Sequence, residues 1–348
     1  MEKIRLGRTG MMVSNLGFGG IPIQRLTENE AIDVIQRALD LGVNFIDTAN
    51  GYTTSEERIG KAIRGRREGL FLATKTLDRT GAGVKEHLKL SLQRLGVAYI
   101  DLYQFHNVND DDTLNAILAP GGPMAVLEEA RKAGVVRHIG ISSHQIDMAK
   151  DLVRSDRFET LMFPFNFITC EPAEELLPLA RQHDVGFIAM KPLAGGMLEN
   201  ASLAFRYLLQ FPDILPIPGI ETRSEIEEIA GIMDSPRALM EAERAEIARL
   251  RQELGTIFCR RCDYCQPCSE KIAISLVIQA ESLFKRLSLE SVFTRHMGPE
   301  LEKAADCIRC GDCEARCPYG LPIMDMIEES YNIVRAEKKK YQAELASQ

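Results

Sequence analysis

Short apolar runs alternate with helical patterns through the first 255 residues of the chain, and this alternation constrains the fold most strongly. Several runs are continuously apolar, as expected for parallel strands that are buried on both faces. The candidate strands are residues 16–20, 44–49, 70–75, 100–106, 136–142, 160–166, 186–192 and 214–219. The candidate helices are residues 28–41, 56–64, 84–95, 124–133, 172–182 and 203–210. Eight strands, each followed by a helix, predict a (β/α)₈ TIM barrel.

A doubly wound α/β sheet is the alternative fold for this pattern. Such a sheet normally has fewer strands and a G-x-G-x-x-G loop after the first one, and the run Gly17-Phe18-Gly19-Gly20 does not match that spacing. Residues 4–15 precede the first candidate strand. The turn residues Gly7-Arg8-Thr9-Gly10 within them predict a small hairpin that closes the bottom of the barrel.

The composition excludes several classes of protein. With 45% hydrophobic and 26% charged residues, the 348-residue chain can bury a large core, so it is neither disordered nor fibrous. A net charge of −8 argues against a general nucleic-acid binder. No apolar run reaches the ~18 residues that a membrane-spanning helix needs. The N-terminal residues lead into no apolar stretch typical of a secretory signal, so we expect a cytoplasmic protein.

Polar residues stand at the ends of three consecutive candidate strands. Asp47 lies at the end of the second strand, Lys75 ends the third and His106 ends the fourth, while Tyr52 lies in the loop after Asp47. Active sites of barrel enzymes lie at the carboxyl ends of the strands, so these side chains are expected to converge on one rim. Each residue alone is more often structural or exposed. Their combination is what predicts a catalytic site.

The four residue types suit the reduction of a carbonyl group. A tyrosine hydroxyl is a weak acid at pH 7, and a neighbouring ammonium group lowers the pKa of that hydroxyl. Lys75 can supply the ammonium group, and Asp47 can keep Lys75 charged and oriented. Tyr52 would then donate a proton to the carbonyl oxygen, while His106 would hydrogen-bond the same oxygen and orient it.

Residues 1–255 resemble the aldo-keto reductases. The motifs that carry the resemblance are Leu6-Gly7-Arg8-Thr9-Gly10, Asp47-Thr48-Ala49-Asn50-Gly51-Tyr52, Ser55-Glu56-Glu57-Arg58-Ile59-Gly60, Ala73-Thr74-Lys75, Gly140-Ile141-Ser142-Ser143-His144 and Pro216-Ile217-Pro218-Gly219. The resemblance implies a (β/α)₈ barrel and a catalytic tetrad of Asp47, Tyr52, Lys75 and His106. It also implies a nicotinamide cofactor at the top of the barrel and hydride transfer to a small aldehyde or ketone.

The resemblance further implies a site for NADP(H) or NAD(H). The matching positions are Ser142, Ser143, Asn166, Met190, Lys191, Pro192, Leu193, Gly195, Gly219 and Arg223. Met190 stands where many members of the family place an aromatic ring under the nicotinamide, and packing in the core is the more frequent role of a methionine on a strand. Glu221 would repel the 2′-phosphate of NADP(H), whereas Arg223 would bind it, so the coenzyme preference stays open.

Eight of the nine cysteines follow residue 258, which sets apart a second domain over residues 256–348. They form two motifs, one of Cys259, Cys262, Cys265 and Cys268 and one of Cys307, Cys310, Cys313 and Cys317. The second motif is the C-x₂-C-x₂-C-x₃-C-P run of bacterial ferredoxins, which indicates [4Fe–4S] clusters. In two-cluster ferredoxins the fourth cysteine of a motif ligates the other cluster. We therefore expect Cys317 to join the first three cysteines of the first motif, and Cys268 to join the first three of the second.

Zinc and free thiols are the alternatives to these two clusters. Zinc sites usually take two C-x₂-C pairs separated by roughly 15–20 residues, whereas each motif here contains four cysteines. The region resembles the ferredoxin-like extension of a subgroup of aldo-keto reductases. Helices are expected over residues 272–289 and 324–345. Cys170 lies outside both motifs and is interpreted as a loop or core thiol.

The leading functional hypothesis is an NAD(P)-dependent oxidoreductase of the aldo-keto reductase type. Its clusters would relay electrons to a protein partner or stabilise the fold of the tail. A [4Fe–4S] cluster passes one electron whereas a hydride carries two, and no flavin motif is recognisable. The alternatives are an electron-transfer or redox-sensing protein whose barrel binds nucleotide without turnover, and a structural subunit. The loops at residues 21–27 and 107–122, together with the tail, are expected to shape the substrate site.

Overall fold

The computed structural model describes residues 1–285, 287–294 and 297–346. The chain divides into two compact units, Met1–Arg244 and Ala245–Gln348. This division falls inside helix α10 (Glu241–Gly255), whereas the sequence places the domain boundary near residue 255, at the end of that helix. Each unit has its own hydrophobic core and is described here by itself.

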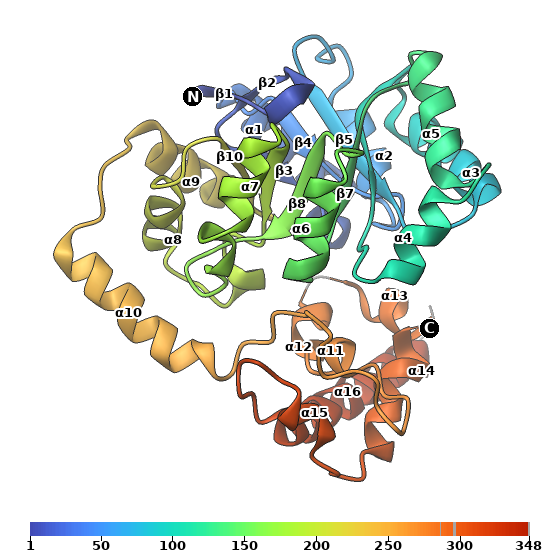
Figure 1. The fold of residues 1–348 in the computed structure, drawn as a ribbon, viewed down its shortest axis with the longest axis vertical. Helices are drawn as coiled ribbons and strands as arrows, with labels where there is room; N and C mark the ends of the chain where they lie inside the picture. Colours follow the sequence, from blue (N-terminus) through green and yellow to red (C-terminus); the bar gives the residue numbers. More distant parts are fainter. Residues whose placement is uncertain (286, 295–296, 347–348) are drawn as a thin grey trace. The chain divides into compact units, whose positions relative to one another are not determined.

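Residues 1–244, all of which are described, contain an eight-stranded parallel sheet (Figure 1). Its strands are β3 (Phe18–Gly19), β4 (Phe45–Asp47), β5 (Phe71–Thr76), β6 (Ile100–Phe105), β7 (Val136–Ser142), β8 (Thr160–Pro164), β9 (Gly186–Met190) and β10 (Ile214–Ile217). Neighbouring strands follow the order of the chain, and a parallel bridge between Gly19 and Gly219 joins the first strand to the last. The predicted (β/α)₈ barrel is therefore confirmed.

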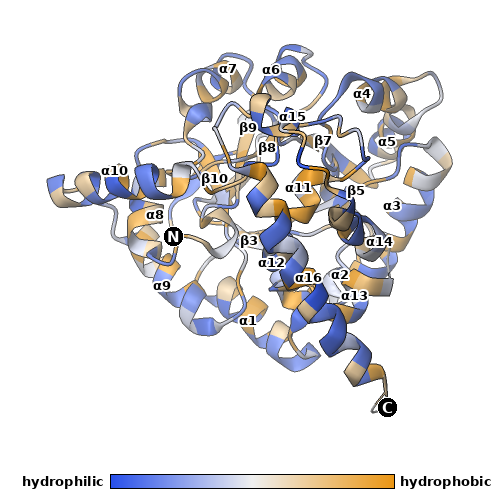
Figure 2. Cartoon of the chain, turned by 90° about the horizontal axis from the view of Figure 1, so that it is seen from below, coloured by the Kyte–Doolittle hydropathy of each residue, from blue (hydrophilic) through white to orange (hydrophobic). Residues whose placement is uncertain are grey.

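Helices surround this sheet, and in Figure 2 their hydrophobic and hydrophilic residues fall on different sides. They are α1 (Glu28–Asp40), α2 (Ser55–Ala62), α3 (Gly81–Leu95), α4 (Asp111–Leu118), α5 (Pro123–Lys132), α6 (Ile146–Arg154), α7 (Leu176–Gln182), α8 (Ala201–Leu208) and α9 (Arg223–Asp234). Local signals in the sequence determine where helices begin. Thr27 and Glu30, for example, form a capping box at the start of α1.

Three segments of the barrel unit differ from their sequence predictions. The expected loop at residues 107–122 contains α4, which begins because the Asp110 side chain accepts a hydrogen bond from the backbone N–H of Thr113 at 2.7 Å. The predicted helix over residues 172–182 is broken into the 3₁₀ helix η3 (Glu171–Ala173) and α7, because Glu175 between them has a non-helical backbone. The expected loop at residues 21–27 includes the 3₁₀ helix η2 (Pro22–Arg25).

Inward-facing side chains fill the lower part of the barrel. The strands contribute Phe45, Ala73, Leu102, Met162, Ile188, Leu215 and Ile217, and the segment before the first strand contributes Leu6, Met11 and Val13. The interior is therefore a packed core, as in other barrels of this kind, and polar side chains can gather only above it.

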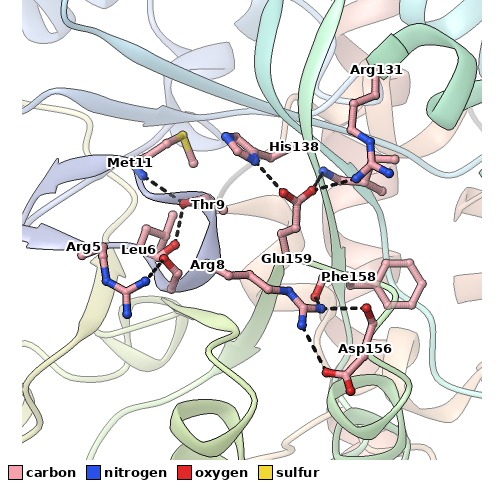
Figure 3. Close-up of polar contacts among 12 residues, drawn as sticks. Arg5, Leu6, Arg8, Thr9, Met11, Arg131, His138, Asp156, Phe158 and Glu159 are labelled. Atoms are coloured by element: carbon pink, nitrogen blue, oxygen red, sulfur yellow. Dashed lines mark hydrogen bonds and ion pairs between the residues drawn. The ribbon is translucent and has the colours of Figure 1, made fainter.

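An N-terminal hairpin closes the bottom of the barrel, as predicted. Strands β1 (Lys3–Arg5) and β2 (Met12–Ser14) pair antiparallel, and the turn between them inserts Leu6 into the core. Arg8 fastens this turn to the loop before β8, where its guanidinium donates to the carbonyl oxygens of Asp156 at 2.8 Å and Phe158 at 2.7 Å (Figure 3). Chain segments that are far apart in the sequence are thus held together at the bottom of the barrel.

The second unit is helical. Its helices are α11 (Ile274–Val277), α12 (Ala280–Phe284), α13 (Leu289–Thr294), α14 (Met297–Glu302), α15 (Asp312–Ala315) and α16 (Ile323–Ala346). Helix α16 confirms the predicted final helix, whereas the single helix predicted over residues 272–289 is divided into α11 and α12, and residue 286 of that prediction lies outside the described residues. In the described part of the chain, no helix combines the length and the apolar character that a membrane span requires.

Candidate active site and cysteine cavities

A buried ion pair lies at the carboxyl ends of β4 and β5. The Lys75 ammonium lies 2.5 Å from Asp47 Oδ2 and donates a second hydrogen bond, at 2.7 Å, to the carbonyl oxygen of Thr48. Asp47 is 3% exposed and Lys75 is 1% exposed. Burial raises the pKa of the Asp47 carboxyl above its usual value, and the ammonium of Lys75 opposes that rise. The two strand-end residues that the sequence singled out are therefore directly paired.

Gln104 completes this pair, and the sequence analysis missed it. Its Nε2 donates to Asp47 Oδ1 at 3.1 Å, and the side chain is fully buried. The alternation of side chains along a strand gives a signal that could have found it, because Gln104 lies two residues before His106 and so faces the same side of the strand. Asp47 thus accepts a hydrogen bond on each carboxylate oxygen.

Tyr52 and His106 lie next to this ion pair. Lys75 Nζ is 5.3 Å from the centre of the Tyr52 ring, and the Tyr52 and His106 rings meet edge to face with their centres 5.9 Å apart. The backbone of His106 is fixed from both sides, because its N–H donates to Thr76 O at 2.9 Å and its carbonyl accepts from Arg79 at 2.5 Å. The structure therefore brings all four predicted tetrad residues together at one rim of the barrel.

Ser142 ends β7 beside this rim, and Ser143 follows it. Ser142 Oγ accepts a hydrogen bond from the backbone N–H of Asn107 at 2.8 Å. Ser143 Oγ donates to Asn109 Oδ1 at 3.1 Å, and the same oxygen accepts from the backbone N–H of His144 at 2.8 Å. Asn109 is a second residue that the sequence analysis missed. These contacts join the loop after β6 to the end of β7 and hold both serines in place.

The next predicted cofactor residues lie after β8 and β9. Asn166 Oδ1 accepts hydrogen bonds from the backbone N–H groups of Ile168 and Thr169, and its Nδ2 donates to Lys191 O at 3.0 Å, so this side chain ties the two loops together. Met190 packs against the barrel core. Lys191, Pro192, Leu193 and Gly195 form the loop after β9, in which Lys191 and Gly195 have positive φ. Gly195 has no Cβ, so it adopts this conformation without strain and a ligand can approach its backbone closely.

The loop after β10 holds two ion pairs. Arg25 lies 3.2 Å from Glu221, and Arg223, the first residue of α9, lies 2.9 Å from Asp33. Burial raises the pKa of the Glu221 carboxyl, and Arg25 partly offsets this rise. Gly219 has a packing role as well, because a Cβ at this position would lie only 2.7 Å from Pro22.

Two cavities in the second unit collect the eight clustered cysteines. Cys259, Cys262, Cys265 and Cys317 line one pocket, which we call cavity A. Cys268, Cys307, Cys310 and Cys313 line a second pocket, which we call cavity B. Each cavity therefore takes three cysteines from one motif and the outermost cysteine of the other, the grouping that ligand sharing between two motifs predicts.

The donor chemistry of both cavities fits iron–sulfur clusters. Each offers four thiols, which lie among apolar residues of the second core and several charged side chains. Burial raises the pKa of Cys262 to about 11 and that of Cys265 to about 12, so binding of metal must displace their protons. Arg316 lines cavity B and donates to the carbonyl oxygens of Cys265 at 3.0 Å and Pro267 at 2.8 Å, which links the two motifs. Cys170 lies in the first unit, just before η3.

Comparison with known families identifies both regions. Residues 15–203 match the model of the aldo/keto reductase family, and residues 258–322 match a 4Fe-4S dicluster domain. The second match agrees with the two cysteine cavities and disfavours zinc as the metal of this region.

Individual relatives match the barrel region. The uncharacterized oxidoreductase YqkF of Bacillus subtilis is 33% identical over 217 residues, which are 58% of this chain and 68% of that protein. The NADH-specific methylglyoxal reductase of Escherichia coli is 29% identical over 230 residues, a match that covers 58% of this chain and 70% of that protein.

Solved structures show the same fold. The aldo-keto reductase AKR11C1 from Bacillus halodurans aligns with a TM-score of 0.63 and 27% identity over 72% of this chain and 96% of that one. An aldo-keto reductase from Klebsiella pneumoniae in complex with NADPH aligns with a TM-score of 0.61 and 23% identity over 72% and 95% of the two chains, which supports the fold alone. With a family model that spans more than half of its residues, a matching barrel and an oxidoreductase relative, the chain belongs to the aldo/keto reductase family.

Proposed function

We propose that this oxidoreductase reduces a small aldehyde or ketone with NADPH or NADH, and that Tyr52 is its proton donor. The observation that carries the proposal is the buried Lys75–Asp47 ion pair next to the Tyr52 ring, with His106 against the ring edge. A buried ammonium group is costly unless it is paired, so this arrangement holds a positive charge where the tyrosine needs it.

Each residue of the tetrad has a defined task in this reaction. Lys75 favours loss of the Tyr52 proton by stabilising the phenolate that forms. Asp47, itself held by Gln104, keeps Lys75 charged and oriented. His106 hydrogen-bonds the carbonyl oxygen and directs it toward Tyr52. The bound nicotinamide supplies the hydride that reduces the carbonyl carbon.

The residues after the strands would hold the dinucleotide. We assign Ser142, Ser143, Asn166 and Met190 to the nicotinamide end, and the loop from Lys191 to Gly195 to the phosphates. Support comes from the hydrogen bonds that order these loops and from the open backbone at Gly195. Gly219 and Arg223 would flank the adenosine end of the cofactor.

For the second unit, we propose that cavity A and cavity B each hold one [4Fe–4S] cluster through their four cysteines. Such clusters supply one-electron transfer, and their assembly contributes free energy to the folding of the unit. Eight thiolates kept for iron imply a reducing compartment, which supports a cytoplasmic location. A second candidate function, electron exchange with a protein partner, is favoured by the dicluster match.

Replacement of Tyr52 by phenylalanine tests the reductase proposal. The variant removes the proton donor but keeps the ring, so carbonyl reduction should fall at least ~100-fold while the Kd for the nicotinamide cofactor stays unchanged. Turnover is measured by oxidation of NADPH and NADH against a panel of aldehydes and ketones, with protein purified anaerobically. Near-normal turnover would contradict the role of Tyr52. Cofactor binding by the wild type without turnover on any carbonyl would favour the electron-transfer alternative.

A further inference from the structure

Glu56 is a buried carboxylate that the tetrad does not use. It lies in the first turn of α2, four residues after Tyr52, and it is 1% exposed. A carboxylate is taken out of water only at a cost of several kcal/mol, unless charged and hydrogen-bonding partners offset the loss. The partners of Glu56 therefore show what this burial achieves.

The first partner belongs to the strand that carries Lys75. Thr74 Oγ1 donates to Glu56 Oε1 at 2.7 Å, and Thr74 is fully buried. Side chains alternate along a strand, so Thr74 faces the helices while Lys75 faces the barrel interior. Glu56 thus holds the helix-facing side of β5, at the residue next to Lys75.

The second partner reaches the loop that carries Tyr52. Arg94 on α3 lies 3.4 Å from Glu56 Oε2, and the same guanidinium nitrogen donates to the carbonyl oxygen of Asn50 at 3.1 Å. The backbone N–H of Asn50 in turn donates to Lys75 O at 2.9 Å. Asn50 is therefore held between Arg94 and the backbone of Lys75, two residues before the proposed proton donor.

We propose that Glu56 and Arg94 are a positioning pair that fixes the Tyr52 loop relative to Lys75. Neither residue touches the reacting atoms, and both act through the geometry of the tetrad. This inference rests on the proposed function, because it presumes that Tyr52 and Lys75 act together. A displacement of about 1 Å at a reacting group can lower the rate by up to ~100-fold. A pair that holds Asn50, two residues before the proton donor, therefore has a measurable effect on turnover.

The test compares Glu56→Gln, Arg94→Gln and the double variant with Glu57→Gln. Glu57 is the matched control, because it is a glutamate of the same helix, half exposed and 3.9 Å from the same arginine. We expect Glu56→Gln and Arg94→Gln each to lower kcat roughly tenfold, while the KM for the carbonyl and the Kd for the cofactor stay within about twofold. The double variant should lose no more than Arg94→Gln alone, since Arg94→Gln already removes the ion pair together with the contact to Asn50. Glu57→Gln should match the wild type.

Other outcomes would overturn the inference. A kcat of wild-type size in a folded Glu56→Gln or Arg94→Gln variant shows that the pair is only structural, as does a lowered melting temperature alone. A multiplicative loss in the double variant shows that the two residues act separately. Arg94 is one-quarter exposed, so its variant keeps the test informative if Glu56→Gln does not fold. Tyr52→Phe separates the two proposals, because retained turnover in that variant would contradict the role of Tyr52 as proton donor, not the role of Glu56 and Arg94 as a positioning pair.

Discussion

At the scale of single residues, charge placement decides what this barrel can do. The ion pair of Lys75 and Asp47 sits in a buried position, where electrostatic interactions are weakly screened and where removal of one partner leaves the other uncompensated. The pair of Arg25 and Glu221, in contrast, is partly exposed and lies in the loop after β10. The first pair is the one that we propose serves the chemistry, and the second lies where the sequence resemblance expects the adenosine end of the cofactor.

Glu221 gives a prediction about coenzyme preference. Its carboxylate would lie near the ribose 2′ position, so Glu221→Gln should lower the KM for NADPH roughly fivefold, while the KM for NADH changes little. The measurement is a pair of steady-state titrations with the two coenzymes at one carbonyl concentration. Glu227→Gln is the control, since Glu227 is a partly exposed glutamate of α9 that pairs with Arg37. An unchanged ratio of the two KM values would place Glu221 away from the cofactor.

At the scale of elements, the N-terminal hairpin shows how a short segment closes a barrel. Its turn inserts Leu6 into the core, and Gly186 at the start of β9 leaves room for it, because a Cβ there would lie 2.8 Å from the Leu6 side chain. Arg8 satisfies two backbone carbonyl oxygens in the loop before β8, which would otherwise lack these hydrogen bonds (Figure 3). All of this lies at the bottom of the barrel, away from the carboxyl ends of the strands, where barrel enzymes carry their active sites.

Replacement of Arg8 by alanine therefore tests a contribution to the stability of the fold that is separate from its activity. The hydrogen bonds to the backbone carbonyl oxygens of Asp156, Phe158 and His183 and the ion pair with the Asp156 carboxylate are lost, so the free energy of unfolding should fall by about 1–3 kcal/mol while kcat stays unchanged. Arg5→Ala is the comparison, because Arg5 pairs with Asp184 at 2.7 Å in a half-exposed position, where solvent screens the pair, and should change the free energy of unfolding less. Urea unfolding of the full chain measures both. Equal losses in the two variants would show that burial of the Arg8 contacts does not matter.

At the scale of the whole molecule, the chain divides into two compact units, for which we propose two kinds of redox chemistry. The first unit gathers the proposed tetrad at the strand ends of a barrel, and the second gathers eight cysteines from two motifs around cavity A and cavity B. Sharing of cysteines between the motifs makes the second unit depend on both of them at once. Loss of one motif therefore affects both proposed clusters.

Paired substitutions test this sharing directly. Cys259→Ser and Cys317→Ser together remove two ligands from cavity A alone, so the double variant should keep about half of the wild-type iron and acid-labile sulfide. Cys307→Ser with Cys317→Ser removes one ligand from each cavity and should weaken both clusters. EPR of the reduced protein distinguishes the remaining signals, and Cys170→Ser is the control that keeps full iron. If the pair at 307 and 317 keeps half of the iron while the pair at 259 and 317 loses all of it, each motif holds its own cluster.

Much of this architecture could be predicted from local patterns. Continuous apolar runs marked the strands because both faces of a parallel sheet are buried, and the tetrad positions followed from polar residues at strand ends. Helix α4 escaped prediction because its acidic start reads like a solvated loop, although Asp110 is its cap. The break before α7 escaped as well, because no proline or glycine marks Glu175.

The sequence by itself determined which elements form, in what order, and which side chains can carry chemistry. Only the tertiary structure decided their partners: Gln104 with Asp47, Asn109 with Ser143, and Glu56 with both Thr74 and Arg94. The physical reason is the distance along the chain between the residues that interact. Strand and helix patterns arise from neighbouring residues, whereas the cost of burying a polar group is offset by partners that the fold brings in from distant parts of the chain.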